Sequence, residues 1–424
     1  MSVLKDLKEL VDRQLISEQQ ADAITLYYKT KKTEQPNKLQ LILGSLGAVF
    51  VGLAIILILA HNWDQFSQFT RVFIGFIPLA LAQLFLLFVL LKKQNSALWK
   101  ETSGILLFFS FAASVFITSQ IYNITDPNGY FYLSWVALSI PFLYLLSSTA
   151  LAILCIVVTT FYMFNYGFNK DLSVEVLYYL LILTSIIPYY LSVLKKSPYS
   201  NTASWLHWVI AISFFLSMFT LGANAASTMA FTLMALSTLY YNIGNLAFFN
   251  DKSAGVNPYR FIGQAGIVII LFVTSYWGYW DNISDDWSKN NLILSYTFLS
   301  GCVFAIVALI FYFRNTKFKP IHLLHFELIL LPFTLIFIFH TGLSALLVNL
   351  LTIILGVVIL LRGIREDRFV LINFGLIIIS VLILIRFFES NLSFLFRGIA
   401  FAVIGLIFFL VNFVLTKHKK KNEL

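Results

Sequence analysis

The sequence is poor in charged residues. Only 12% of its 424 residues are charged, whereas soluble domains carry roughly 25%, and 59% are hydrophobic. Cysteine is also scarce: Cys155 and Cys302 both lie in apolar segments, so neither a disulfide framework nor a metal site is predicted. A glycine-rich phosphate loop, a nucleophile elbow and a His-Glu-x-x-His motif are all missing. These absences argue against catalysis of the soluble type, and we expect no metal and no cofactor.

Long apolar segments dominate what is present. From Leu41 onward, fourteen segments approach the length of about 20 residues that crosses a bilayer. They cover 41–60, 70–91, 103–122, 130–147, 149–167, 175–194, 203–222, 226–249, 260–280, 291–313, 321–339, 342–361, 369–388 and 394–415. The weakest boundaries are at 147–149 and 340–342, so twelve or thirteen spans are alternatives. Because helices satisfy their own backbone hydrogen bonds in lipid, the predicted fold is all-α, a polytopic bundle of about 14 transmembrane helices over residues 39–416.

Residues 1–38 have the charge and periodicity of a short soluble segment. Ser17 followed by Gln20 is a capping-box pattern, which predicts a helix from there to about Lys32, after an earlier helix. We expect a cytoplasmic helical hairpin that packs on itself at the membrane surface. The alternative is that it docks an envelope protein or a cytoplasmic partner, or gates the membrane part. We expect no cleavable signal peptide.

Positive charge is distributed unevenly along the chain. With the N-terminus inside, 24 of the 29 Lys and Arg residues fall in inner segments. The exceptions are Arg71, Lys170, Lys289, Arg386 and Arg397. The positive-inside rule therefore predicts an even number of spans, cytoplasmic termini and a basic cytoplasmic tail over 417–424. The net charge of +9 is a topology signal, and no nucleic-acid partner is expected.

Three of the exceptional bases follow an acid by seven or eight residues at an outer turn. The pairs are Asp64–Arg71, Asp281–Lys289 and Glu389–Arg397. They represent either a degenerate internal repeat or the usual composition of interfacial turns.

The first and last of these turns supply the candidate substrate-binding residues. They are Asn62, Trp63, Asp64, Arg71, Arg386, Glu389 and Arg397. Guanidinium groups match phosphate or carboxylate, so one hypothesis is that the first and last hairpins meet and receive an anionic head group. The simpler alternative is a local ion pair between Arg386 and Glu389, which share a helix face.

Glu327 stands about six residues inside the apolar segment 321–339. We expect it to be protonated or paired with Asn349 or Asn373, and intramembrane acids of this kind suggest proton or cation coupling. His322 and His325 face together nearby. They are interpreted as polar anchors, because Glu327 does not complete a metal-binding face.

Several motifs together resemble a known family. They are Leu15-Ile16-Ser17, Gly44, Gly47, Gly52, Asn62-Trp63-Asp64, Arg362-Gly363, Asn373-Phe-Gly375, Arg386-Phe-Phe-Glu389 and Arg397-Gly398. The set is similar to an uncharacterised family of predicted multi-span bacterial membrane proteins, best over 1–90 and 345–415. Glu389 stands where that family more often has Asp. The resemblance implies a bacterial inner membrane protein with a cytoplasmic N-terminal hairpin, and it implies no activity.

Three functions remain open at this point. The first is a transporter or flippase-like protein for an anionic or amphipathic, lipid-like substrate, with membrane lipids as partners. The second is a non-catalytic scaffold or sensor that partners another envelope protein. The third is a membrane transferase on a lipid-linked substrate, with Asp64 as acid or base. A cavity joining the outer arginines to Glu327 would favour transport, and a solid bundle with paired charges would favour the scaffold.

Overall fold

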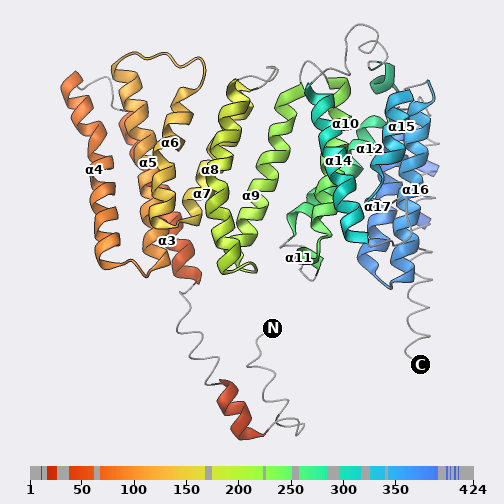
Figure 1. Cartoon of the computed structure of the whole chain (residues 1–424), viewed down its shortest axis with the longest axis horizontal. Helices are drawn as coiled ribbons and strands as arrows, with labels where there is room; N and C mark the ends of the chain where they lie inside the picture. The colour runs from red at the N-terminus through yellow and green to blue at the C-terminus, as the bar shows by residue number, and fades with distance from the viewer. Residues whose placement is uncertain are drawn as a thin grey trace. The chain divides into compact units, whose positions relative to one another are not determined.

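The computed structural model of the chain describes residues 17–25, 38–61, 67–167, 174–222, 226–250, 257–281, 296–316, 325–339 and 342–389, with a few isolated positions outside these ranges. All regular elements in these ranges are helical (Figure 1). Their bounds are α3 Lys38–His61, α4 Gln68–Lys92, α5 Ala97–Ile121, α6 Tyr130–Leu146, α7 Thr149–Tyr166, α8 Val174–Lys196, α9 Asn201–Met218, η2 Phe219–Gly222, α10 Ala226–Gly244, α11 Ala247–Asn250, α12 Pro258–Thr274, α14 Tyr296–Thr316, α15 Leu330–Phe339, α16 Ser344–Arg365 and α17 Phe369–Glu389.

The helices follow the predicted spans closely. Each span from 41–60 to 369–388 contains a helix, and the last, 394–415, lies largely outside the described residues. The weak boundary at 147–149 is a true break, since α6 ends at Leu146 and α7 begins at Thr149. Ser147 has φ 51°, a left-handed conformation that no helix interior adopts.

Seven of the described helices are long and apolar enough to cross a membrane. They are α4, α5, α7, α8, α14, α16 and α17. Helices α6, α12 and α15 are apolar but shorter. The structure therefore supports an all-helical, multi-span protein, while the count of about 14 spans stays a prediction.

The helix predicted after Ser17 is present over residues 18–25. Its capping box is confirmed: the Gln20 backbone N–H donates to Ser17 Oγ (3.2 Å), and the Ser17 N–H donates to Gln20 Oε1 (3.0 Å). The first helix of the predicted hairpin lies almost wholly outside the described residues, so the hairpin as such stays a prediction.

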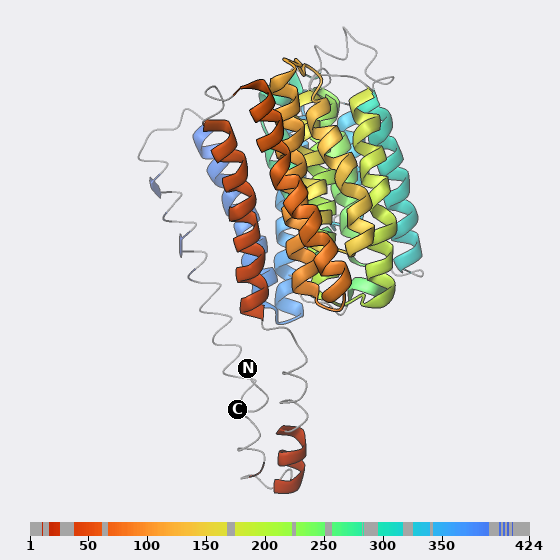
Figure 2. The same cartoon turned by 90° about the vertical axis from the view of Figure 1, so that its left-hand side faces the viewer.

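The helices divide into two compact units. Unit 1 comprises Met1–Thr159 and Ile182–Tyr189, and unit 2 comprises Thr160–Leu181 and Tyr190–Leu424. In unit 1, α5 is the central helix and packs against α3, α4 and α6. Helix α5 runs roughly antiparallel to α4 and α6, as two perpendicular views show (Figure 1, Figure 2). The core between α4, α5 and α6 consists of Ala82, Leu86, Leu107, Phe111 and Leu146.

In unit 2, α10 packs against α12 and α14, and α16 packs against α17. The α10–α12 and α16–α17 contacts depend on glycines that bring backbones close together. A Cβ on Gly263 of α12 would lie 2.5 Å from the Tyr241 backbone N of α10. A Cβ on Gly375 of α17 would lie 2.6 Å from the Gly356 carbonyl oxygen of α16. Small residues at helix contacts are typical of bundles in lipid, where close packing replaces the hydrophobic driving force.

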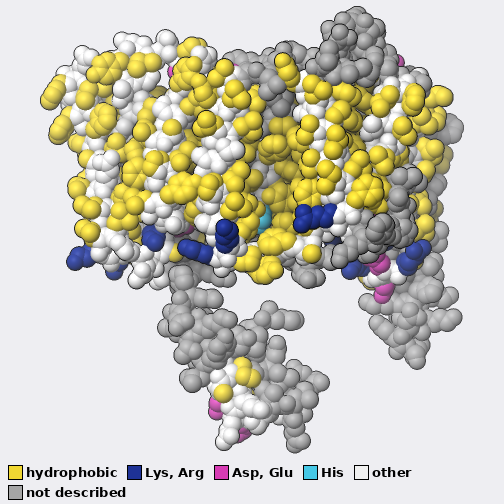
Figure 3. All heavy atoms as spheres, in the orientation of Figure 1, with side chains coloured by type: hydrophobic (Ala, Val, Ile, Leu, Met, Phe, Trp, Pro, Cys, Tyr) yellow, Lys and Arg dark blue, Asp and Glu magenta, His cyan; other side chains and the backbone are white. Residues whose placement is uncertain are grey.

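The sides of the helices are apolar and exposed. On α4 alone, Leu81, Leu84 and Leu91 are each at least 60% exposed. Figure 3 shows hydrophobic side chains covering the helix flanks in each unit, with Lys and Arg gathered near one end of the helices of that unit. Soluble monomers rarely expose apolar surface of this extent, so the flanks are suited to lipid.

Candidate functional site: an apolar pocket with an acidic mouth

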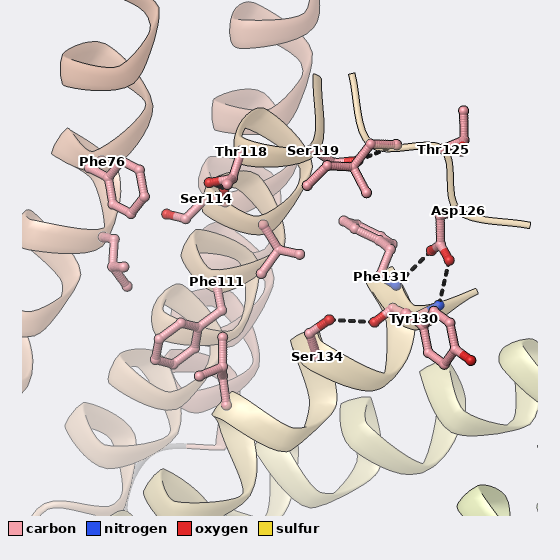
Figure 4. Close-up of a pocket in the computed structure, with 14 residues that line it drawn as sticks. Phe76, Phe111, Ser114, Thr118, Ser119, Thr125, Asp126, Tyr130, Phe131 and Ser134 are labelled. Atoms are coloured by element: carbon pink, nitrogen blue, oxygen red, sulfur yellow. Dashed lines mark hydrogen bonds between the residues drawn. The ribbon is translucent and has the colours of Figure 1, made fainter. Parts of the chain in front are cut away.

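Unit 1 contains a pocket of about 450 Å³ between α4, α5 and α6. It is lined by Phe76, Leu79, Phe111, Ser114, Val115, Thr118, Ser119, Ile124, Thr125, Asp126, Tyr130, Phe131, Ser134 and Leu138 (Figure 4). The volume falls within the range of roughly 300–1,000 Å³ that small-molecule sites occupy. Its wall is mostly apolar, with polar groups concentrated toward the α5–α6 connection.

Asp126 is fixed at this connection by the helix that follows it. Its Oδ1 accepts the Tyr130 N–H and its Oδ2 accepts the Phe131 N–H, both at 2.7 Å. These are N–H groups of the first turn of α6, which have no partner within the helix and favour a negative charge. Gly129 permits the tight entry, with φ 71°. The carboxylate is therefore held rigidly at the edge of the pocket.

Hydroxyl groups line one side of the pocket. The Thr118 hydroxyl donates to the Ser114 carbonyl (2.8 Å), and the Ser119 hydroxyl donates to the Ile124 carbonyl (3.1 Å). The Ser114 hydroxyl is different: the residue is 5% exposed, and its Oγ has no hydrogen-bond partner among the described residues. Figure 4 shows this oxygen directed from α5 toward the side where Phe76 lies. A buried hydroxyl without a partner costs about 1–3 kcal/mol, so a polar group in the pocket would be stabilised there.

A second polar cluster of unit 1 holds the start of α7. The Glu101 carboxylate accepts the Ser148 hydroxyl (2.5 Å) and the backbone N–H groups of Thr149 (2.9 Å) and Ala150 (2.8 Å). The Tyr189 hydroxyl lies 3.0 Å from Thr149 Oγ1. Glu101 thus caps α7 from another helix, which is a structural role that we did not predict.

The candidate residues of the first hairpin are only partly described. Asn62, Trp63 and Asp64 lie outside the described residues. Arg71 is half-buried in the first turn of α4, whose N-cap is Ser67. It lies on the same helix as Phe76 but does not line the pocket.

The last hairpin belongs to unit 2. Arg386 Nη2 donates to Ser275 Oγ (3.1 Å), and Asn349 Nδ2 donates to the Ser275 carbonyl (3.1 Å). Two predicted residues, assigned to different roles, therefore meet at one serine. The Glu389 side chain and Arg397 lie outside the described residues. Since Arg71 is in unit 1, the meeting of the first and last hairpins stays a prediction.

Glu327 is not inside a spanning helix, and this corrects our expectation. It lies in a turn, and α15 begins only at Leu330. Its side chain is 31% exposed, and Oε2 lies 3.9 Å from His325 Nδ1. The two expected partners are engaged elsewhere or point outward: Asn349 binds Ser275, and Asn373 is exposed on α17. The pairing of Glu327 with Asn349 or Asn373 is therefore not observed, and its role in proton or cation coupling stays a prediction.

His325 is buried and takes part in a cluster that the sequence did not predict. Arg362 Nη1 lies 2.7 Å from His325 Nε2. Because an arginine only donates, Nε2 must accept, so the imidazole is neutral with its proton on Nδ1. Arg362 Nε also donates to Glu366 Oε1 (2.6 Å). The i,i+4 spacing of Arg362 and Glu366 was the available signal. His322 lies outside the described residues, which contain no group of three metal-binding side chains.

The Arg362–Glu366 pair predicts a pH effect. The hydrogen bond from Arg362 lowers the pKa of the Glu366 carboxyl below its ordinary value. A lowered pKa contributes stability above the ordinary value of about 4.3 and loses it as the pH falls through the lowered value. We therefore expect the melting temperature in detergent to fall less on acidification below about pH 4 in Arg362→Gln than in wild type. Equal acid sensitivity in both proteins would contradict the pairing.

These features define a class: a helical membrane protein with several apolar spans, short connections and an apolar pocket among its helices. Residues 8–152 match the family described as "Predicted membrane protein (DUF2157)". The match confirms the resemblance predicted from the motifs for this part of the chain, which holds the pocket. No curated protein and no solved structure matches the chain.

Proposed function

We propose that this chain is a multi-pass inner-membrane protein that recognises an amphipathic, lipid-like molecule in the α4–α5–α6 pocket, in a transporter or flippase-like role. The observation that carries the proposal is the pocket itself, with an apolar wall and a polar mouth. With the N-terminus inside, the α5–α6 connection faces the extracytoplasmic side. The substrate's polar group would then enter from the outer leaflet.

The energetics of such a site differ from those of a soluble protein. When the hydrocarbon tail of an amphipathic ligand moves from lipid into an apolar pocket, it exchanges one hydrocarbon environment for another, so the tail contributes little binding free energy. Selectivity must therefore come from shape and from the few polar groups. The buried Ser114 hydroxyl and the fixed Asp126 carboxylate are the groups placed to supply it.

Filling the pocket tests the proposal. Ser134 is half-buried on α6 and lines the pocket, so Ser134→Trp places a large ring in the space without entering the core. We expect wild type, purified in mild detergent, to retain a co-purified amphiphile, and Ser134→Trp to lose at least about 90% of it, since the ring occupies the ligand's volume. Native mass spectrometry measures the bound species, and liposomes with a fluorescent amphiphile measure its movement between leaflets.

Ala137→Trp is the matched control. Ala137 is exposed on the same helix and does not line the pocket, so the added ring meets lipid. Equal retention in Ser134→Trp, Ala137→Trp and wild type would overturn the proposal. The scaffold or sensor function, favoured by charges that pair among themselves such as Arg362 and Glu366, would then take its place. Binding that depends on the pocket without movement between leaflets would remove the transport role alone.

A further inference from the structure

The lining of the pocket also determines the charge of its ligand. We infer that the substrate is an amphiphile with an ammonium group, which rests beside Asp126 while its tail lies against α4 and α5. The inference depends on the proposed function and names the substrate class for the same site.

Charge is the first argument. Asp126 is the one acidic residue among the fourteen that line the pocket, and none of them is Lys, Arg or His. Each carboxylate oxygen accepts one backbone N–H and retains capacity for a second hydrogen bond. An ammonium donates to such oxygens and neutralises the charge. A phosphate or carboxylate head group would instead meet a like charge with no base to offset it.

The surroundings of Asp126 suit the same chemistry. Figure 4 shows the Phe131 ring near the Asp126 carboxylate, whereas the Tyr130 ring points away from it. Aromatic rings close to a carboxylate are the combination that binds alkylammonium groups, since the ring face attracts a cation and tolerates its methyl or methylene groups. The anionic head group predicted from the arginines is therefore not the ligand that this pocket favours.

The tail has a matching environment. Phe76, Leu79, Phe111 and Leu138 form the apolar wall away from the α5–α6 connection. Leu138 is 46% exposed, and so is accessible from the lipid-facing side of α6. A molecule with its cation at Asp126 and its tail along this wall would keep its tail in an apolar environment throughout.

The test compares three probes with the same tail on the full chain in lipid nanodiscs: dodecylammonium, whose N–H groups can donate to Asp126, dodecyl glucoside and dodecanoate. Specific binding is the part that Ser134→Trp removes. We expect the ammonium probe to bind most tightly. Asp126→Asn should raise the dissociation constant of the ammonium probe about fivefold, which is the upper end for a partly exposed ion pair. The dissociation constant of the glucoside should not change. Asn keeps one side-chain oxygen, which can accept one of the two α6 N–H groups, and unchanged glucoside binding verifies that the pocket is intact.

The outcomes separate the two proposals. If the glucoside or dodecanoate binds as well as the ammonium probe, or if Asp126→Asn does not weaken the ammonium probe, the charge assignment is wrong and the pocket's general role stands. If none of the probes shows binding that Ser134→Trp removes, the pocket holds annular lipid only, and the charge assignment and the proposed function both fail.

Discussion

Gly263→Val is expected to cost about 3 kcal/mol of stability and to disrupt the contact between α10 and α12. The Cβ of any larger residue would lie 2.5 Å from the Tyr241 backbone N and 2.7 Å from the Ser237 carbonyl oxygen. Both are backbone atoms of a neighbouring helix, so they cannot move aside as a flexible side chain would. Overpacking of this kind typically costs 1–3 kcal/mol, and backbone contacts place the cost at the high end. Thermal unfolding in detergent, followed by tryptophan fluorescence, measures the loss.

Gly47→Val is the matched control for this substitution. Gly47 lies inside α3, and a Cβ there would have no atom within 4 Å. Since valine has a better helix propensity than glycine, we expect the control to be neutral or slightly stabilising. If both variants lose stability equally, the cost arises from valine in a helix and not from the α10–α12 approach.

Glu101→Ala is expected to have the second largest effect, a loss of about 2 kcal/mol localised at the corner between α6 and α7. The substitution leaves the first N–H groups of α7 and the Ser148 hydroxyl without their acceptor. Loss of an N-cap costs about 0.5–2 kcal/mol, and hydrogen bonds to a charged group are stronger than neutral ones. Hydrogen exchange of the Thr149 and Ala150 amides should rise sharply, because these amides lose their protection.

Two further variants isolate the cap from the charge. Glu101→Gln retains an acceptor oxygen and should recover part of the lost stability. Lys100→Ala changes the neighbouring residue, which does not cap α7, and should remain within about 0.5 kcal/mol of wild type. Exchange at Thr149 that is unchanged in Glu101→Ala would show that the contact does not hold the helix.

Short-range sequence patterns predicted where individual helices begin and end. Ser17 and Gln20 predicted a helix start, and the two reciprocal hydrogen bonds are present. The boundary at 147–149 was one of the two weakest of the prediction, and the helices do end and begin there. Both signals depend on residues within one turn of each other, where spacing alone determines which atoms meet.

Glu327 shows where the same reasoning failed. An apolar run of suitable length was assumed to be one helix, which placed the acid within the bilayer. The helix begins three residues later, so the acid lies in a turn beside His325. Hydropathy gives the composition of a span but does not fix where its first turn begins.

The pocket was not predicted, although one part of it, the turn between α5 and α6, has a recognisable sequence pattern. Asp126-Pro-Asn-Gly129 between two apolar runs is a turn with a helix cap, and it was available as a signal. Ser114 offered none, because a serine in an apolar helix usually bonds to its own backbone or to a neighbouring helix. Its unpaired hydroxyl is visible only once α4, α5 and α6 are placed together.

The sequence by itself determined the class of this protein. A chain with 12% charged and 59% hydrophobic residues, arranged in long runs, is suited to helices in lipid, because only self-satisfied backbones are tolerated there. The tertiary structure decided which residues act together: Glu101 with α7, Arg386 with Asn349 through Ser275, and Asp126 with a pocket of three helices. These contacts join segments that are distant in the chain, and they depend on how helices pack against one another, which periodicity within one helix does not specify.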